Sequence, residues 1–276
     1  HAKRLNLSRY VARISRPAAD GPLRVAIIGA GISGMVAART LADHGHQVCV
    51  FEKARGFGGR LATRRIESGA FDHGAQYFTA RDTRFRPWVD SWRQMGVVQR
   101  WKGRIGVLRH GQFRDERERH ERFVALPGMS ALAGHLASGL TVKLNTAIRR
   151  IRKKGPKMTL IDADGGSWGD YDALIVSTPP VQAAQLLAGL APLTEQLKTV
   201  VMTPCWAVML AFAEPVCLPF DGAFVHDAEI AWAARNSSKP GREGDECWVL
   251  HAGADWSQAN ISAEPETVIS RLSASF

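Results

Sequence analysis

The sequence contains few cysteines and no long apolar run, and each absence excludes a class of protein. Its four cysteines, Cys49, Cys205, Cys217 and Cys247, form no Cys-x-x-Cys pair and have no histidine-rich partner spacing, so neither a disulfide framework nor a metal site is predicted. This pattern favours the reducing cytoplasm. No apolar run approaches the roughly 20 residues of a membrane span. The 276 residues, 45% of them hydrophobic and 22% charged, suit one large globular domain or two interleaved ones.

The net charge of +10 would by itself suggest a nucleic-acid partner. Much of the excess comes from the first sixteen residues, where Lys3, Arg4, Arg9, Arg13 and Arg16 meet no acidic residue. Elsewhere the basic residues are mixed with acids, as on an ordinary solvated surface. We therefore expect a basic arm over residues 1–22, and no nucleic-acid partner.

Residues 23–51 have the order of a strand, a glycine turn, a helix and a second strand. An apolar run at 23–28 is followed at once by the turn at 29–34, then by a helical period, and then by a second apolar run at 47–51. This order is that of a βαβ unit of the dinucleotide-binding kind.

The glycines of this turn have the spacing that a bound pyrophosphate requires. Gly29 allows the tight turn, Gly31 lets backbone N–H groups approach the phosphates, and Gly34 lets the helix pack closely on the strand. The start of the helix, at Ile32 and Ser33, adds a partial positive charge.

An acidic residue, Glu52, follows the second strand at the position where a carboxylate accepts hydrogen bonds from the adenosine ribose. Lys53 comes next, but the acidic side chain makes a 2′-phosphate a poor ligand here. The turn and the carboxylate together predict a bound dinucleotide.

The segment at residues 52–63 distinguishes FAD from NAD. Its glycines Gly58 and Gly59 permit close backbone approach, and the fork of Arg60, followed by Leu61, can hold phosphate oxygens. The segment resembles the second signature of the flavin amine-oxidase superfamily, in which a Gly-Gly-Arg turn lies against the FAD pyrophosphate. The resemblance implies non-covalently bound FAD.

Three further segments resemble the same superfamily. Residues 71–78 are similar to the stretch that runs under the flavin ring, residues 145–148 to the strand that meets adenine, and residues 171–179 to a late strand that ends near the cofactor. The FAD contacts that this resemblance implies, beyond those already named, are Gly74, Ala75, Gln76, Tyr77, Ile148 and Thr178.

Within the superfamily, the stretches at 72–79, 127–130 and 232–241 resemble bacterial renalase-type oxidoreductases. The resemblance implies an oxidase that takes hydride from wrongly reduced isomers of NAD(P)H and passes the electrons to oxygen, giving hydrogen peroxide. A small-molecule substrate and molecular oxygen would then be its partners. Two other reactions remain open: oxidation of amines or polyamines, and desaturation of a lipophilic ring system.

The family's closing Gly-Asp turn and glycine-rich helix start are not found. Gly244 and Asp245 are followed by residues 246–248, which indicate a strand. We therefore expect an FAD-binding domain that is incomplete on its C-terminal side, and weak FAD binding by this chain. A flavin-free remnant that binds a nucleotide or a partner is the non-enzymatic alternative.

The predicted fold class is α/β, with a Rossmann-like FAD-binding domain interleaved with a substrate domain built on an antiparallel sheet with helices. Residues 23–80 and 124–180 are assigned to the first domain, and residues 81–123 and 181–276 to the second. A flavin oxidase needs no Ser-His-Asp array, because the cofactor performs the difficult step. The candidate catalytic residues, all on predicted strands of the substrate sheet, are Trp232, His226 and His251, and core packing is the alternative role for each.

Overall fold

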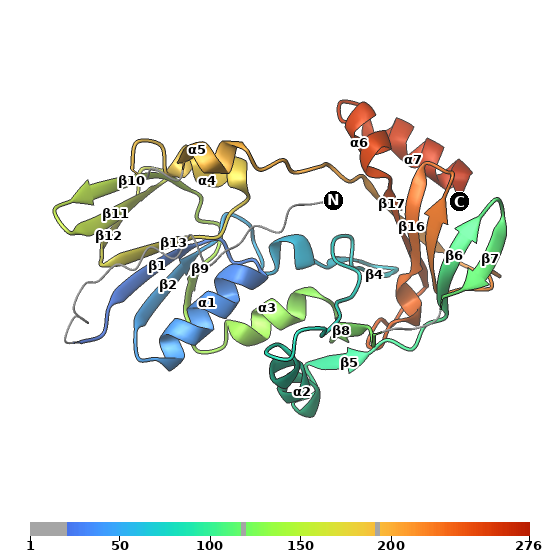
Figure 1. The fold of residues 1–276 in the computed structure, drawn as a ribbon, viewed down its shortest axis with the longest axis horizontal. Coiled ribbons are helices and arrows are strands. Elements are labelled where there is room, and N and C mark those ends of the chain that lie inside the picture. The colour runs from blue at the N-terminus through green and yellow to red at the C-terminus, as the bar shows by residue number, and fades with distance from the viewer. Residues whose placement is uncertain (1–20, 117–119, 191–193) are drawn as a thin grey trace.

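The computed structural model describes residues 21–276 except 117–119 and 191–193. The predicted basic arm lies almost entirely outside the described residues. Figure 1 shows two lobes side by side, one around strands β1, β2 and β13, and the other around β16 and β17. Helices α2 and α3 and strands β5 and β8 lie between them.

The first lobe is built on a four-stranded sheet in the order β13-β1-β2-β9. The strands are β1 (Arg24–Ile28), β2 (Gln47–Phe51), β9 (Thr141–Lys143) and β13 (Ala173–Val176), and every pair in the sheet is parallel. A parallel sheet of this kind confirms the predicted Rossmann-like domain. Helix α1 (Ile32–Asp43) connects β1 and β2, and Val25, Ile27, Met35 and Ala38 form the core between sheet and helix.

A separate three-stranded antiparallel sheet continues this lobe. It contains β10 (Ile148–Lys154), β11 (Lys157–Asp162) and β12 (Ser167–Tyr171). Strand β10 was not predicted, because five of its seven residues are basic and only Ile148 and Ile151 are buried. These antiparallel strands form a sheet separate from the parallel one.

The second lobe is built on a six-stranded sheet in the order β14-β17-β16-β15-β6-β7. Its strands are β6 (Ile105–Arg109), β7 (Gln112–Asp115), β14 (Ala207–Phe212), β15 (Gly222–His226), β16 (Ile230–Arg235) and β17 (Glu246–Ala252). The sheet is antiparallel as predicted, except that β15 and β6 pair in parallel.

One face of this sheet packs against helices and the other against the cofactor lobe. Helices α6 (Ala254–Ala259) and α7 (Pro265–Ser275) lie at one face, where Val268 and Leu272 contact Trp248 and Leu250. On the other face, Cys247 and Val249 pack with Phe71 of β4, which comes from the cofactor lobe. The second face is therefore the one turned toward the cofactor lobe.

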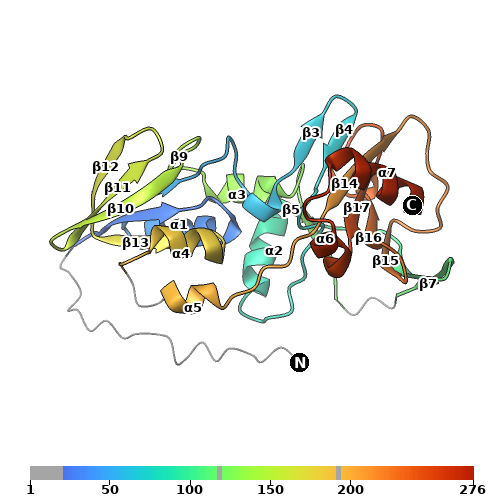
Figure 2. The same cartoon turned by 90° about the horizontal axis from the view of Figure 1, so that it is seen from above.

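Three helices that the sequence assigned to the substrate domain pack beside the cofactor lobe. Helix α2 (Arg86–Gln94) buries Val89 and Trp92 in the same core as α1 and α3 (Ser130–Leu136). Helices α4 (Pro180–Leu186) and α5 (Thr194–Lys198) lie beside the cofactor lobe in both views (Figure 2), although residues 181–276 were assigned to the substrate domain. The remaining short elements are η2 (Gly59–Leu61), β3 (Arg64–Ile66), β4 (Gly69–Phe71), β5 (Val98–Arg100), β8 (Phe123–Ala125) and η3 (Asn236–Ser238).

No helix among the described residues is both long enough and apolar enough to cross a membrane.

Candidate functional site

The first glycine turn has the geometry that the sequence predicted. Gly29 has a φ of +107° and its N–H donates to Phe51 O at 2.8 Å. A Cβ at Gly34 would overlap the carbonyl oxygen of Gly29, so only glycine lets α1 start this close to β1. A Cβ at Gly31, in contrast, would meet no atom within 4 Å and would point into open space.

That open space belongs to a cavity of about 530 Å³, here called the nucleotide cavity. Eight of the predicted cofactor residues line it, namely Gly29, Gly31, Glu52, Lys53, Gly59, Arg60, Ile148 and Thr178. Thr146 and Ser177 also line it and belong to segments that were expected near the cofactor, whereas Arg149, Gln182 and Gln185 were missed. The two glutamines belong to helix α4, whose place beside the cavity no local pattern indicates.

The second glycine turn lies directly against the first. Gly58 and Gly59 have φ angles of +113° and +54°, and Gly58 N–H donates to Ala30 O at 3.0 Å. A Cβ at Gly59 would lie 3.4 Å from the Cα of Gly31. Two turns separated along the chain thus form one backbone wall of the cavity, and Arg60 extends from its edge.

Glu52 is held in place by backbone donors. Its Oε2 accepts from Ala30 N–H at 2.7 Å and its Oε1 accepts from Ala54 N–H at 2.9 Å. An ionised carboxylate offers about four lone-pair positions, so each oxygen of Glu52 can accept another hydrogen bond from within the cavity. The carboxylate is therefore oriented before any ribose arrives.

The cavity fits the nucleotide part of FAD on three observations. The position next to Gly31 is open, and the oriented carboxylate of Glu52 lines the same cavity. Thr178 Oγ1 is buried at this cavity and has no hydrogen-bond partner in the described part of the chain. A buried hydroxyl without a partner is costly, and a ligand oxygen or nitrogen would satisfy it.

Beyond Arg60, the chain segment at residues 72–77 touches the second glycine turn. Ala75 N–H donates to Arg60 O at 2.8 Å, and a Cβ at Gly74 would overlap that same carbonyl. Gln76 points away into a buried polar cluster, whereas Tyr77 packs on aromatic rings of the substrate lobe. Of the other predicted cofactor residues, Ile32, Ser33 and Gly34 form the first turn of α1, and Leu61 is buried with Tyr77.

The structure brings two of the three candidate catalytic residues together. Trp232 on β16 and His251 on β17 are cross-strand partners. The Trp232 ring lies 5.8 Å from Tyr77 and 4.7 Å from Phe224, and its Nε1 is buried without a hydrogen-bond partner among the described residues. His226, at the end of β15, is exposed and does not join them.

His251 is held in one tautomer. Its Nε2 lies 2.9 Å from the carbonyl oxygen of His73, and because a carbonyl only accepts, Nε2 carries the proton. Burial lowers the pKa of His251, and the charge of Lys239 lowers it further. Burial, aided by Arg64, also lowers the pKa of His73. His251 is thus a neutral imidazole at neutral pH, with Nδ1 as an acceptor.

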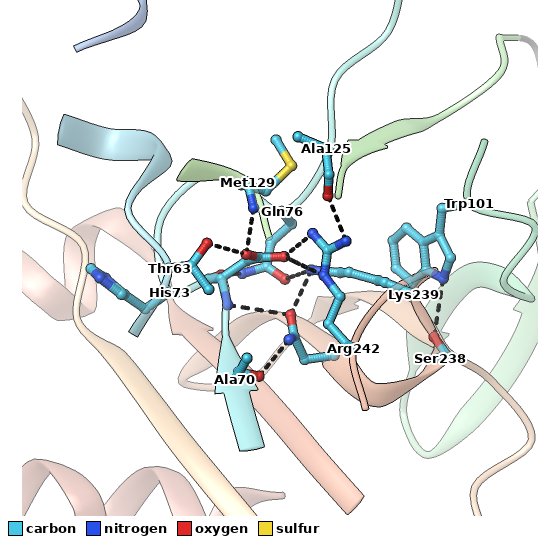
Figure 3. Close-up of polar contacts among 12 residues, drawn as sticks. Thr63, Ala70, His73, Gln76, Trp101, Ala125, Met129, Ser238, Lys239 and Arg242 are labelled. Carbon is cyan, nitrogen blue, oxygen red and sulfur yellow. Dashed lines mark hydrogen bonds and ion pairs between the residues drawn. The ribbon is translucent and has the colours of Figure 1, made fainter. Parts of the chain in front are cut away.

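Figure 3 shows a buried polar cluster that sequence reasoning missed. It consists of Asp72, Gln76, Asn236, Lys239 and Arg242 and is called the Asp72 cluster below. Asp72 and Gln76 come from the segment that touches Arg60, and the other three follow β16 in the substrate lobe. The sequence singled out the stretches at 72–79 and 232–241, which contain Asp72, Gln76 and Lys239, but neither stretch indicates that these side chains are buried together.

The two glycine turns, the oriented Glu52 and the partnerless Thr178 hydroxyl define a dinucleotide-binding site. Residues 109–269 match the family model "Flavin containing amine oxidoreductase", and residues 27–92 match "NAD(P)-binding Rossmann-like domain". The first match covers more than half of the chain. The chain therefore belongs to the flavin-containing amine oxidoreductase family, which makes it an FAD-dependent oxidoreductase.

Solved structures share the fold over nearly the whole chain. A putative protoporphyrinogen oxidase from Exiguobacterium sp. superposes with a TM-score of 0.72 at 12% identity, over 93% of this chain and 82% of that one. A putrescine oxidase bound to putrescine gives 0.72 at 13% identity, over 92% and 80%. An oxidoreductase from Methanosarcina mazei gives 0.65 at 14%, over 91% and 84%. At these identities the likeness concerns the fold alone.

Curated relatives match only a short segment. A 4-hydroxybenzoate brominase (decarboxylating) of Pseudoalteromonas luteoviolacea is 46% identical over 56 residues, which is 20% of this chain and 11% of that protein. A 4,4'-diapophytoene desaturase of Staphylococcus aureus is 40% identical over 52 residues, or 19% and 10%. The matched part is about a tenth of each relative's length.

Proposed function

We propose that this protein is a renalase-like oxidase that takes a hydride from the dihydronicotinamide ring of NAD(P)H isomers and passes the electrons to oxygen. The proposal rests on the charge of the Asp72 cluster, which lies next to the second glycine turn. The Asp72 cluster sets two cations, Lys239 and Arg242, against one carboxylate. A site with excess positive charge favours an anionic dinucleotide over a cationic amine.

In this reaction one C–H bond of the substrate breaks, and the substrate leaves as an aromatic pyridinium. FAD, when bound, accepts the hydride and returns two electrons to oxygen, which with two protons becomes hydrogen peroxide. The protein's task is to bind both partners, orient them and exclude water.

We assign the binding of the cofactor to the residues named above. The first glycine turn, the start of α1 and Arg60 would hold the pyrophosphate, Glu52 the ribose, and Ile148 and Thr178 the adenosine end. Residues 74–77 would support the flavin ring. The two domains of this proposal are those given from the sequence, with α2, α4 and α5 packed beside the cofactor lobe.

We assign the substrate to the face formed by Trp232, Tyr77 and His251. Aromatic rings suit a flat nicotinamide, and the free Nε1–H of Trp232 offers it a hydrogen-bond donor. The Nδ1 atom of His251 is an acceptor for the substrate's carboxamide N–H. The hydride transfer itself needs no base, so His251 acts by orientation.

Amine oxidation is the second candidate, and one observation favours it. A neutral imidazole such as His251 could take a proton from an ammonium group before oxidation. The excess of positive charge in the Asp72 cluster argues against a polyamine, because no carboxylate in that cluster is free to pair with it.

Anaerobic stopped-flow absorbance distinguishes the two reactions. The chain is first loaded with FAD and then mixed with 1,2- or 1,6-dihydronicotinamide isomers, or with putrescine and spermidine. We expect rapid flavin bleaching by the isomers and a release of hydrogen peroxide when oxygen is admitted. Bleaching by the amines alone would contradict the proposal and favour the second candidate.

A further inference from the structure

Asp72 is the centre of the Asp72 cluster, and its carboxylate is already well satisfied. Arg242 donates to Oδ2 from Nη2 at 2.6 Å and from Nε at 3.2 Å. Oδ1 accepts from Met129 N–H at 2.9 Å and from Thr63 Oγ1 at 2.8 Å. Burial alone would raise the pKa of Asp72, but Lys239 and Arg242 outweigh it and lower the pKa. The carboxylate is ionised and bound mainly to Arg242.

Lys239 shares the carboxylate of Asp72 with Arg242 and is the more distant of the two cations. Its side chain is 0% exposed, and Nζ donates to Gln76 Oε1 at 2.8 Å and to Asn236 Oδ1 at 2.9 Å, both neutral acceptors. Asp72 Oδ2 lies farther away, at 3.5 Å, and the ring of Trp101 covers the ammonium with its centroid at 5.4 Å. Figure 3 shows this arrangement, with Lys239 between the carboxylate and the tryptophan.

The charges of the cluster therefore do not balance. One carboxylate faces two cations, and the nearby imidazoles of His73 and His251 are neutral because burial lowers the pKa of each. Burial, opposed by Asp72 and assisted by Arg242, lowers the pKa of Lys239 to about 7, so the surplus charge is fully present below pH 7 and is lost as the pH rises through that value. A buried cation without full pairing is costly, and such a cost marks candidate functional sites.

The surplus charge is in contact with residues 72–76, the segment that touches the second glycine turn. Gln76 and Asp72 belong to the same five residues as Ala75, whose N–H is bound to Arg60 O. Arg60 lines the nucleotide cavity. Lys239 thus fixes residues 72–76 through its contacts with Asp72 and Gln76, and these residues connect it to Arg60 at the nucleotide cavity.

We propose that Lys239 is a positioning residue that holds residues 72–76 and supplies the surplus positive charge of the Asp72 cluster to the flavin site, where it stabilises negative charge on the bound cofactor. The inference rests on the proposed function, in which a hydride brings two electrons and one proton to the flavin and so adds one negative charge. Charges inside a protein are screened less than charges in water, so Lys239 can act on the flavin site without touching the flavin.

Sulfite tests this charge without any turnover, because it adds to oxidised flavin as an anion and bleaches it. Wild type, Lys239→Met and Lys157→Met are loaded with FAD and titrated with sulfite. We expect Lys239→Met to weaken sulfite binding about tenfold and to lower the flavin midpoint potential. The control Lys157→Met removes an ion-paired lysine on β11 and should behave as wild type. Equal sulfite affinity in wild type and Lys239→Met overturns the proposal.

Lys239→Gln separates charge from structure, because its amide can still donate to Gln76 or Asn236. Weak sulfite binding in this variant supports a role of charge. Wild-type affinity would mean that Lys239 only maintains the structure, and would overturn the proposal. If both variants fail to fold, the wild type itself is titrated across pH, with sulfite's own ionisation subtracted. Affinity should then fall as Lys239 loses its proton near pH 7, and a constant affinity counts against the proposal.

If the wild type does not take up FAD, the proposed function is contradicted. The charge of Lys239 can then still be tested in the protein without FAD. The folded pKa of Lys239, about 7, lies below its ordinary 10.5, so in this interval the unfolded chain binds more protons. Stability should therefore rise between pH 7 and 10.5, and this rise should disappear in Lys239→Met. The same profile in both proteins would show that Lys239 carries no such surplus.

Discussion

One wall of the nucleotide cavity is backbone from two glycine turns, whereas the Asp72 cluster is assembled from side chains that are far apart in the chain. In the cavity, Gly29, Gly31 and Gly59 act by lacking a side chain. In the cluster, Asp72 and Lys239 act through charges that are separated by more than half of the sequence. The first arrangement is specified locally and the second only by the packing of the two lobes. Substitutions should therefore affect them differently.

The largest effect is expected from Asp72→Ala. It would leave Arg242 and Lys239 buried without a carboxylate, and breaking such a pair costs about 3–5 kcal/mol. Urea denaturation should show this loss, while Asp164→Ala, at an exposed aspartate, should change little. A loss of under about 1 kcal/mol would mean that the cluster does not hold the lobes together.

Next come two alanine substitutions in the first glycine turn. Gly34→Ala forces a Cβ against the carbonyl of Gly29 and should cost about 1–3 kcal/mol as well as FAD binding. Gly31→Ala meets no protein atom and should fold normally, yet it would fill the cavity and weaken FAD binding. Melting curves and flavin fluorescence measure the two properties, with Gly169→Ala, at a glycine with free space, as control. Equal stability of both variants would contradict the geometry of the turn.

A smaller effect is expected for Glu52→Gln. The amide nitrogen cannot accept, so it must face either Ala30 N–H or Ala54 N–H, and one of the two backbone bonds that orient the side chain is lost. We expect FAD affinity to fall about tenfold, in line with the loss of a hydrogen bond to a charged group. Fluorescence titration measures it. Unchanged affinity would mean that Glu52 supports the backbone and not the ribose.

The smallest effect concerns the two candidate histidines. His251→Ala should slow flavin reduction by dihydronicotinamide isomers by about tenfold, since one substrate hydrogen bond is lost. His226→Ala, at an exposed strand end, should not change it. Stopped-flow absorbance compares both with wild type, and equal rates for all three proteins would remove His251 from the proposed site.

Much of the cofactor lobe could be predicted because its signals are local. The strands at β1, β2 and β13, the glycine turns and the position of Glu52 follow from short patterns of apolar residues and glycines. Strand β10 was missed because Arg and Lys dominate it, and its pairing with β11 overrides that composition. The packing of helix α2 could not be predicted, since its sequence does not say which core Val89 and Trp92 enter.

The sequence by itself determined the dinucleotide turn, because a glycine's missing side chain acts on its immediate backbone and needs no distant partner. It also determined the family, through motifs of the same local kind. Only the tertiary structure decided that Trp232 and His251 lie together while His226 does not. It alone decided that Lys239 is buried beside Asp72, because burial and charge pairing depend on how two lobes pack, and no spacing along the chain records that contact.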